Sequence, residues 1–457
     1  MIRTVVVIFL ALTCLAQDDW FGGLRPDVDS AGDFVQVPAA SDAIIVDGGE
    51  ASPTEALIST DDGDTPRNVE VPTLARGGET AVVGAPVPAS SPSSTGTSLG
   101  QSVNQLAAAI MARLRQTNGD SNVVFSPLSI AACFSLLYAG AEGETKEELD
   151  RVFGFKNGAV ANELLQKANS VGAAALANRV YVSPAIDPMA DYVDAIGPNS
   201  IAQIDFSSPQ ATQEVNAWVD QMTSGSLGDL IPEGFFSAAT RLALVNAIYF
   251  QGSWAEPFPT SLTQQGEFRG AAGSKIVDFM MYDSFRRYKS KELPSLSAQM
   301  LQFPYDDGQH AMFVILPRAD DGWGAVERGV ELSPSFFLDD FVNNLEFNVM
   351  MPKWAFEMFI DDLDSILVDL GLEGVFSNAD LSGIADSGEP LFVSHAIHKA
   401  KIKVDEQGTE AAAGTSGAVA TSLPPPAEDF HMDHPFLYYI VNLNDGAILF
   451  QGTVTDI

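Results

Sequence analysis

The stretch at residues 408–426, GTEAAAGTSGAVATSLPPP, constrains the fold of this chain more than any other feature of the sequence. After Glu410 it has no charged, aromatic or large side chain until Leu423, and this composition is typical of a linker. The stretch also alternates like a strand, because every second residue from Thr409 to Val419 is small enough to be buried. No proline precedes Pro424, so all the earlier backbone N–H groups can join a ladder. Two interpretations follow: an exposed linker, or a strand that can enter the centre of a sheet.

The first 16 residues predict a secretory signal peptide. One Arg precedes an apolar run from Val5 to Leu15, and small residues at 14–16 suit a signal peptidase. The run is short for a membrane span, which makes an uncleaved anchor the weaker alternative. Cleavage removes Cys14 and leaves Cys133 as the only thiol, so we expect a secreted, extracellular protein without an internal disulfide.

Residues 17–100 predict a disordered acidic extension. They carry 14 acidic and 3 basic side chains, a net charge of −11, and end in a linker-like run rich in Pro, Ser and Gly. The extension is either a solvating tail or a specific binding arm. The whole chain has a formal net charge of −36. Nucleic acid, anionic membranes and heparin-like polyanions are therefore not expected as partners, since each needs a positive field.

Residues 101–457 read as one α+β domain with helices early and strands late. Apolar spacing predicts a helix from Gln101 to Asn118. Ser126-Pro127 supplies an N-cap and a first-turn proline for a second helix through Tyr138. Thr145-Lys-Glu-Glu148 predicts a capping box that opens a third. The strand predictions are Asn122–Phe125, Ala175–Val182, Leu242–Phe250, Ala311–Leu316, and a hairpin of Phe436–Asn442 with Ala447–Gly452.

The segment from His398 to Ala413, HKAKIKVDEQGTEAAA, resembles the reactive-loop hinge of the serpins. Seven other motifs resemble serpin motifs in the proper order, and together they span the folded region: Phe125–Ile130 with Leu137–Ala141, Leu176–Val182, Asn216–Val219, Leu244–Trp254, Met351–Trp354, Phe376–Gly383 and His434–Phe436. The resemblance implies a serpin fold, a single domain of about nine helices and three β-sheets with an exposed reactive loop.

The resemblance implies that the chain is a suicide-substrate inhibitor of serine proteases, with cysteine proteases as the alternative target class. A cleaved reactive loop inserts into the main sheet and traps the covalent acyl-enzyme. Gly408 is the expected pivot of the hinge. Small side chains in the hinge favour an inhibitory member over a binding, storage or chaperone protein, although Gly414 and Gly417 weaken a strand interior. The hinge residues are Glu406, Gly408, Thr409, Glu410, Ala411, Ala412 and Ala413.

The expected reactive bond is Ser422–Leu423, because the family cut usually falls about 16 residues after the glutamate at Glu406. Counting back from Pro435 points near Pro424, and Thr421–Ser422 is a second possibility. The loop has no Arg or Lys between Glu410 and Met432, so a trypsin-like target is not expected. An uncharged residue at the cut favours elastase-like or subtilisin-like enzymes.

Further residues are carried over from the family to a region that governs opening of the main sheet. Ser126, Ser129, Asn246 and His398 match a polar group under that sheet. Trp254 matches a tryptophan beneath the point where insertion starts. Lys353 matches the partner of Glu406 in a charged pair at the same place.

Other functions fit the sequence less well. Two H-x-x-H pairs, His395 with His398 and His431 with His434, lie in strand or loop contexts where positions three apart diverge, so we expect no metal and no cofactor. No Gly-x-Ser-x-Gly motif surrounds a serine near these histidines, so we expect no enzyme activity. Family members that bind heparin carry a basic helix in the span between Phe155 and Leu176. The basic residues there are only Lys156 and Lys167, so we expect no activation by heparin. We expect a monomer.

Overall fold

The computed structural model describes residues 98–167, 174–386, 391–409 and 427–457. The predicted signal peptide and almost all of the predicted acidic extension therefore lie outside the described residues. So does the part of the alternating stretch that follows Thr409, up to Pro426.

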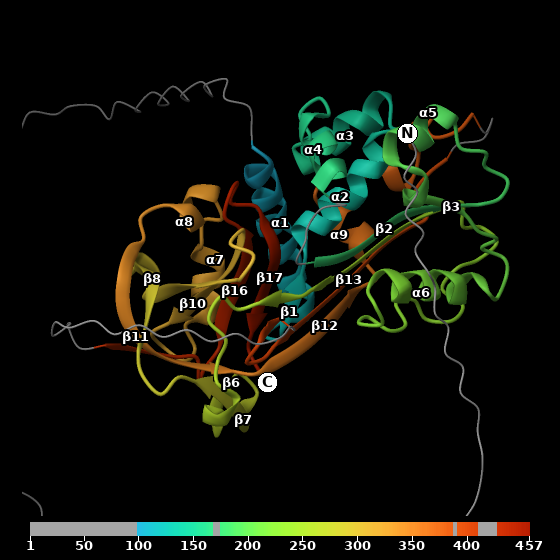
Figure 1. Cartoon of the computed structure of the whole chain (residues 1–457). Helices are drawn as coiled ribbons and strands as arrows, with labels where there is room; N and C mark the ends of the chain where they lie inside the picture. The colour runs from blue at the N-terminus through green and yellow to red at the C-terminus, as the bar shows by residue number, and fades with distance from the viewer. Residues whose placement is uncertain (1–97, 168–173, 387–390, 410–426) are drawn as a thin grey trace, which may run out of the picture. The chain divides into compact units, whose positions relative to one another are not determined.

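The described residues contain nine α-helices, and the four formed before residue 168 pack together in the upper middle of Figure 1. The helices are α1 (Leu99–Asn118), α2 (Pro127–Tyr138), α3 (Gly143–Phe153), α4 (Ala159–Lys167), α5 (Ala190–Ile196), α6 (Ala211–Met222), α7 (Trp323–Gly329), α8 (Pro334–Leu338) and α9 (Leu363–Asp369). The first two begin and end within two residues of their predicted bounds. The Ser126 hydroxyl caps α2 as expected, accepting a hydrogen bond from the Ser129 N–H at 3.1 Å.

A five-stranded sheet, which we call the main sheet, has the order β12-β13-β4-β2-β3. Its strands are β2 (Ala174–Val182), β3 (Ile201–Gln203), β4 (Leu242–Phe250), β12 (Trp354–Ile360) and β13 (His395–Val404). In Figure 1, α2 lies on one side of β2 and β13, and α6 lies on the other. The prediction of a strand covered on both faces is confirmed for Leu242–Phe250, where every residue is buried. For Ala175–Val182 it holds only in part, because half of that strand is partly exposed.

The side chains of strand β4 alternate between the two buried faces of the main sheet. All nine of its residues are buried. Val245 and Tyr249 pack in a cluster with α6, whereas Leu244 and Ile248 pack in the larger core with α2. Asn246 lies on the α2 face, so a polar side chain is placed inside an apolar layer.

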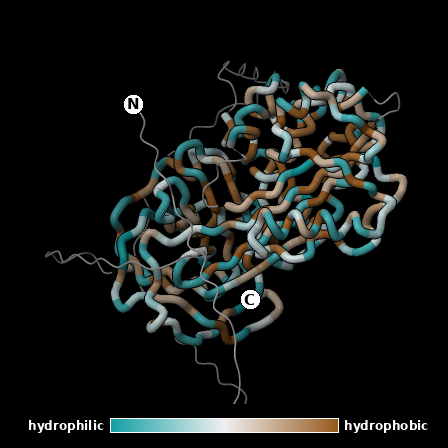
Figure 2. Tube along the Cα trace, turned by 45° about the vertical axis from the view of Figure 1, so that its right-hand side comes forward, coloured by the Kyte–Doolittle hydropathy of each residue, from teal (hydrophilic) through white to brown (hydrophobic). Residues whose placement is uncertain are grey.

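A larger sheet of ten strands has the order β1-β17-β16-β10-β9-β8-β11-β7-β6, with β15 paired in parallel to β11. Its strands are β1 (Val123–Phe125), β6 (Gln264–Gly270), β7 (Gly273–Met281), β8 (Arg286–Leu293), β9 (Ala298–Pro304), β10 (His310–Pro317), β11 (Val342–Pro352), β15 (Glu428–His431), β16 (Phe436–Asn442) and β17 (Ile448–Val454). The third sheet is a short ribbon of β5 (Gly252–Ser253) and β14 (Gly408–Thr409). Figure 2 shows that apolar residues concentrate between these layers. The α+β class, with nine helices and three sheets among the described residues, is confirmed.

The predicted capping box at Thr145–Glu148 is wrong. Helix α3 begins two residues earlier, at Gly143, and its N-cap Glu142 makes no side-chain capping bond. The Thr145 hydroxyl instead accepts a hydrogen bond from the Asp380 N–H, and the Glu148 carboxylate accepts one from the Gly374 N–H, each at 2.8 Å. The Thr145 and Glu148 side chains therefore bind the backbone of a distant segment and do not cap the helix.

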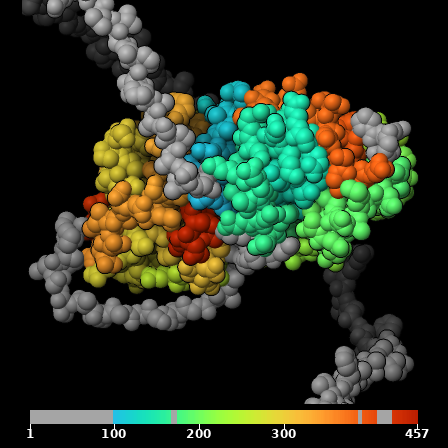
Figure 3. All heavy atoms as spheres, turned by 90° about the horizontal axis from the view of Figure 1, so that it is seen from above, coloured from blue at the N-terminus to red at the C-terminus, as the bar shows by residue number. Residues whose placement is uncertain are grey.

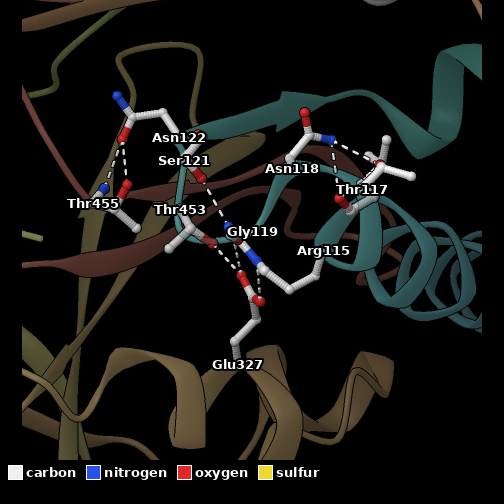
Figure 4. Close-up of polar contacts among 10 residues, drawn as sticks. Arg115, Thr117, Asn118, Gly119, Ser121, Asn122, Glu327, Thr453 and Thr455 are labelled. Carbon is white, nitrogen blue, oxygen red and sulfur yellow. Dashed lines mark hydrogen bonds and ion pairs between the residues drawn. The ribbon is translucent and has the colours of Figure 1, made fainter. Parts of the chain in front are cut away.

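Helix α1 is attached to two distant parts of the chain by ion pairs of very different burial. Arg113 meets Asp369 of α9 at 3.5 Å on the surface, and Figure 3 shows the N-terminal helices beside the orange segment that contains α9. Arg115 makes two hydrogen bonds to Glu327 of α7, at 2.8 and 2.9 Å, and Glu327 also accepts one from the Thr453 hydroxyl of β17 (Figure 4). The Glu327 side chain is only 4% exposed.

Candidate functional site

Four of the carried-over residues form one buried hydrogen-bonded group between α2 and the main sheet. The Ser126 backbone N–H donates to Nε2 of His398 at 3.2 Å. Nδ1 of His398 hydrogen-bonds to Oδ1 of Asn246. Nδ2 of Asn246 donates to the Ser129 carbonyl at 3.0 Å. The chain thus brings together residues that lie 272 positions apart, at the junction between β13 and β4.

The protonation state of His398 follows from these bonds. Since Nε2 accepts from a backbone N–H, the ring proton lies on Nδ1, which donates to Asn246. Burial lowers the pKa of His398 to about 3, because a charged imidazole loses its hydration there. The side chain is neutral at physiological pH and belongs to a network in which each member has a partner.

The main sheet contains two parallel neighbours at its centre. Strands β13 and β4 pair from His395 opposite Ala243 to Lys401 opposite Tyr249. The other described neighbours of these two strands, β12 and β2, run antiparallel to them. A segment that entered between β13 and β4 in the opposite direction would therefore make two antiparallel ladders in place of one parallel ladder.

The chain reverses direction directly after β13. Asp405 and Gly408 form an antiparallel bridge, with hydrogen bonds of 2.9 and 3.1 Å. Gly408 has a φ of 135°, and a Cβ added there would lie 2.2 Å from the Gly252 carbonyl oxygen. Only glycine fits this turn, which is the geometry expected of a pivot. Beyond it, β14 runs antiparallel to β5 for two residues.

Glu406 joins this turn to Lys353, the residue before β12. Its carboxylate lies 3.0 Å from Nζ of Lys353 and accepts a hydrogen bond from the Thr263 hydroxyl at 2.6 Å. Burial raises the pKa of Glu406, but the hydrogen bonds from Thr263 and Lys353 outweigh it, so that the net pKa is lowered. The pair holds the end of β13 to the start of β12.

Trp254 holds the same turn from the other side. Its indole Nε1 donates to the Asp405 carbonyl at 3.0 Å, and its backbone N–H donates to the Gln407 carbonyl at 2.9 Å. The indole stacks on Tyr305, with ring centroids 4.9 Å apart. The turn after β13 is therefore fixed by aromatic packing as well as by charge.

Six of the predicted site residues are not placed. Glu410, Ala411, Ala412 and Ala413 of the hinge, and Ser422 and Leu423 of the reactive bond, lie outside the described residues. Their roles stay predictions.

Comparison with known proteins decides the family. The family model described as "Serpin (serine protease inhibitor)" matches residues 101–457. This chain belongs to the serpin family. It is 34% identical to rice Serpin-ZXA over 77% of this chain and 94% of that protein. It is 31% identical to the pig leukocyte elastase inhibitor, with 77% and 97% covered. The structure of the Tenebrio molitor serpin titled Serpin48 matches with a TM-score of 0.69 at 29% identity, covering 79% of this chain and 98% of the other.

The predicted family and serpin fold are thus confirmed. Serpins are inhibitors of proteases rather than catalysts, although some members are non-inhibitory. Within this serpin, the structure also adds residues that sequence reasoning missed. Asn178 of β2 accepts a hydrogen bond from Asn246, and Thr263 binds Glu406. Asn178 lies inside a motif noted in the sequence, whereas nothing near Thr263 indicates its role.

Among the described residues, no group of three or more His, Cys, Asp or Glu side chains is placed to hold a metal ion. His395 instead packs against Phe235, with ring centroids 4.7 Å apart, and His434 hydrogen-bonds to Asp433 and to the Pro317 carbonyl. Within the same ranges, no helix is both long and apolar enough to span a membrane. Cys133 is a free, buried thiol.

Proposed function

We propose that this serpin is a secreted suicide-substrate inhibitor of serine proteases, which traps the acyl-enzyme by inserting its reactive loop into the main sheet. The observation that carries the proposal is the parallel pairing of β13 with β4, next to a turn that reverses the chain directly after β13. A loop that leaves β13 through this turn runs in the direction required to enter between the two strands.

The covalent step belongs to the protease. Its serine hydroxyl attacks the Ser422 carbonyl, the Ser422–Leu423 C–N bond breaks, and an ester joins the Ser422 carbonyl carbon to the serine oxygen. The proton of the hydroxyl passes through the protease histidine to the Leu423 amine, which leaves. Water would later hydrolyse the ester. Insertion of the loop, with the protease attached, must take place before that hydrolysis.

The residues of the loop support fast insertion. Thr409, Ala411 and Ala413 are small and two positions apart in the sequence, so in an inserted strand they would share one face and meet little steric resistance inside the sheet. Each residue inserted forms backbone hydrogen bonds that contribute on the order of 1 kcal/mol net. Some 13–15 residues at about 3.3 Å each would carry the protease roughly 45 Å. The distorted protease can then no longer deacylate.

We infer that the targets are elastase-like or subtilisin-like enzymes. Ser422 is small and uncharged, which suits a shallow or apolar specificity pocket. Pig leukocyte elastase inhibitor, at 31% identity, supports the same class. A cysteine protease is a second target class, because a thiolate can form the equivalent thioester.

The test is incubation of the full chain with pancreatic elastase or subtilisin, followed by denaturing electrophoresis. We expect a complex that survives SDS and a released C-terminal peptide that begins at Leu423. The same protease with its serine blocked is the control and should give neither product. Stoichiometric cleavage at Ser422 without any stable complex would reject the inhibitory mechanism.

A non-inhibitory serpin that serves as a binding, storage or chaperone protein is the second candidate. It is favoured by Gly414 and Gly417, which lower the strand propensity of the segment that must insert. After loop cleavage, its melting temperature would stay unchanged. An inhibitory serpin should instead gain thermal stability, since the inserted strand forms two antiparallel ladders in place of one parallel ladder.

Secretion is proposed from the N-terminal sequence alone. The mature chain is expected to start at Gln17 and to circulate as a monomer without cofactor. Intact mass of the protein released from expressing cells tests the cleavage site, and sedimentation tests the monomer. A protein retained inside the cells with Met1 in place would reject the proposal.

A further inference from the structure

A pocket of about 400 Å³ lies at the place where two neighbouring strands of the larger sheet separate. Strand β8 pairs with β9 only as far as Lys289 opposite Gln302. Its preceding residues, Arg286 to Tyr288, pair only with β11, on the other edge of β8. The pairing of β8 with β11 is itself interrupted between Val342 and Leu345. The pocket follows from this topology, because a sheet that divides leaves a gap that backbone ladders do not close.

Aromatic side chains make the apolar wall of this pocket. Tyr288 packs against Phe303, with ring centroids 5.1 Å apart, and Trp254 lies 6.2 Å from the same ring. Phe258 stacks on Tyr282 at 4.6 Å. These five rings all line the pocket. A volume of this size with aromatic walls is typical of a site for a small molecule.

Two polar side chains in the pocket have no partner among the described residues. Gln302 is only 7% exposed, yet no hydrogen bond to its carboxamide is found there. Its carboxamide is therefore free to form a hydrogen bond with a ligand in the pocket. Lys289 is exposed and forms no ion pair within the same ranges, although the chain has 60 acidic residues against 24 basic ones.

The two side chains are placed to act together. Lys289 and Gln302 are directly opposite in the antiparallel pairing of β8 with β9, so they lie on one face of the sheet. The other cations nearby are occupied: Arg287 lies 2.9 Å from Glu346, and Arg286 lies 3.7 Å from Glu256. Lys289 is therefore the cation in the pocket that is available to an anion.

We propose that this pocket binds a small amphipathic acid, a flat apolar molecule that carries one carboxylate. The apolar body packs among the aromatic rings. The carboxylate meets the Lys289 ammonium and accepts a hydrogen bond from the Gln302 carboxamide. A neutral analogue keeps the apolar contacts but forms no ion pair with Lys289, so it should bind more weakly.

Two residues that line the pocket also hydrogen-bond to the turn after β13. The backbone N–H of Trp254 donates to the Gln407 carbonyl, and that of Phe258 donates to the Glu406 carbonyl at 2.8 Å. A ligand that fixes these two aromatic residues also fixes the turn. On the proposed inhibitory function, on which this step rests, the bound acid slows loop insertion, since the turn must be released.

Binding is tested with 1-pyrenebutyrate and its neutral counterpart 1-pyrenebutanol, by fluorescence anisotropy on the full chain. We expect the acid to bind about tenfold tighter than the alcohol, a difference of about 1.4 kcal/mol. Lys289→Gln should remove this preference. Lys156→Gln removes the same charge from an exposed lysine outside the pocket and should keep it. Gln302→Leu should weaken binding of the acid more than that of the alcohol.

Equal binding of acid and alcohol, or an equal effect of the two lysine substitutions, would overturn the site. The link to the hinge has a separate readout, which is the rate at which the SDS-stable complex with elastase forms, with and without saturating 1-pyrenebutyrate. An unchanged rate at saturation would overturn the link and leave the site standing. Absence of any complex under either condition would count against the inhibitory function and not against the pocket.

Discussion

His398 and Asn246 are directly opposite each other in the parallel pairing of β13 with β4, and the imidazole donates a hydrogen bond to the asparagine side chain. This bond crosses the boundary at which the main sheet must open to admit another strand. Asn246 also donates to the Ser129 carbonyl at 3.0 Å, so the same contact ties both strands to α2. Opening the sheet requires that the pair separate while it is shielded from water.

Asn246→Ala should destabilise the native protein by about 1–3 kcal/mol, because it leaves the buried Nδ1–H of His398 without an acceptor and removes the hydrogen bond to Oδ1 of Asn178. Thermal unfolding followed by circular dichroism measures the effect. Asn162→Ala, at an exposed position of α4, is the matched control and should change stability by less than about 0.5 kcal/mol. Equal melting temperatures for the two variants would contradict the role given to the pair.

The stability of the native protein should fall as the pH falls below about 6.5, in part because of His398. Its folded pKa is lowered to about 3 by burial, so the native state stays neutral where the unfolded chain takes up a proton near pH 6.5. Above pH 6.5 both states are neutral and the residue contributes no pH dependence. Between pH 6.5 and 3 the loss is up to about 1.4 kcal/mol per pH unit.

His398→Gln removes this titration and keeps a neutral side chain that can both donate and accept. Denaturant midpoints at pH 7.5 and 5.5 should therefore differ more for the wild type than for the variant. Comparison of the two proteins cancels the carboxylates, which titrate alike in both. Identical pH slopes would show that His398 is not neutral and buried in solution.

Thr409→Arg should convert the proposed inhibitor into a substrate. The large charged side chain would have to enter the sheet as the first inward residue, which delays insertion until the ester is hydrolysed. Glu410→Arg is the control, since the alternation turns that position to the opposite face. Titration of elastase activity should show a stoichiometry of inhibition raised at least tenfold for Thr409→Arg and little changed for Glu410→Arg. Similar stoichiometries would contradict the predicted inward face.

Glu327→Ala should cost about 3–5 kcal/mol of stability, because it removes the carboxylate that pairs with Arg115 at a site where both side chains are largely buried. Arg115 keeps its hydrogen bonds to the Gly119 and Ser121 carbonyls. Asp369→Ala breaks the other ion pair of α1, but that pair is exposed and should contribute less than about 1 kcal/mol. Chemical denaturation of the two variants measures the contrast. A smaller effect for Glu327→Ala than for Asp369→Ala would show that burial does not decide the strength of these pairs.

Much of the local structure could be predicted from the sequence because its causes are local. Apolar spacing and caps predicted α1 and α2, and the uninterrupted apolar run of Leu242–Phe250 predicted a strand buried on both faces. The predicted capping box at Thr145 was wrong because its side chains have long-range partners. Its side chains bind the backbone near residues 374 and 380, which local pattern cannot reveal.

The sequence by itself determined the family and most of the elements. Only the tertiary structure decided that Asn246 faces His398, that Thr263 supports Glu406, and that β8 departs from β9 to leave a pocket beside Trp254. The physical reason is the separation in sequence between the residues that determine each feature. Backbone conformation and amphipathic spacing are set within a few residues, whereas the buried hydrogen bonds of Asn246 and Thr263 join residues more than a hundred positions apart. The pocket in turn gathers side chains from several separate segments of the chain.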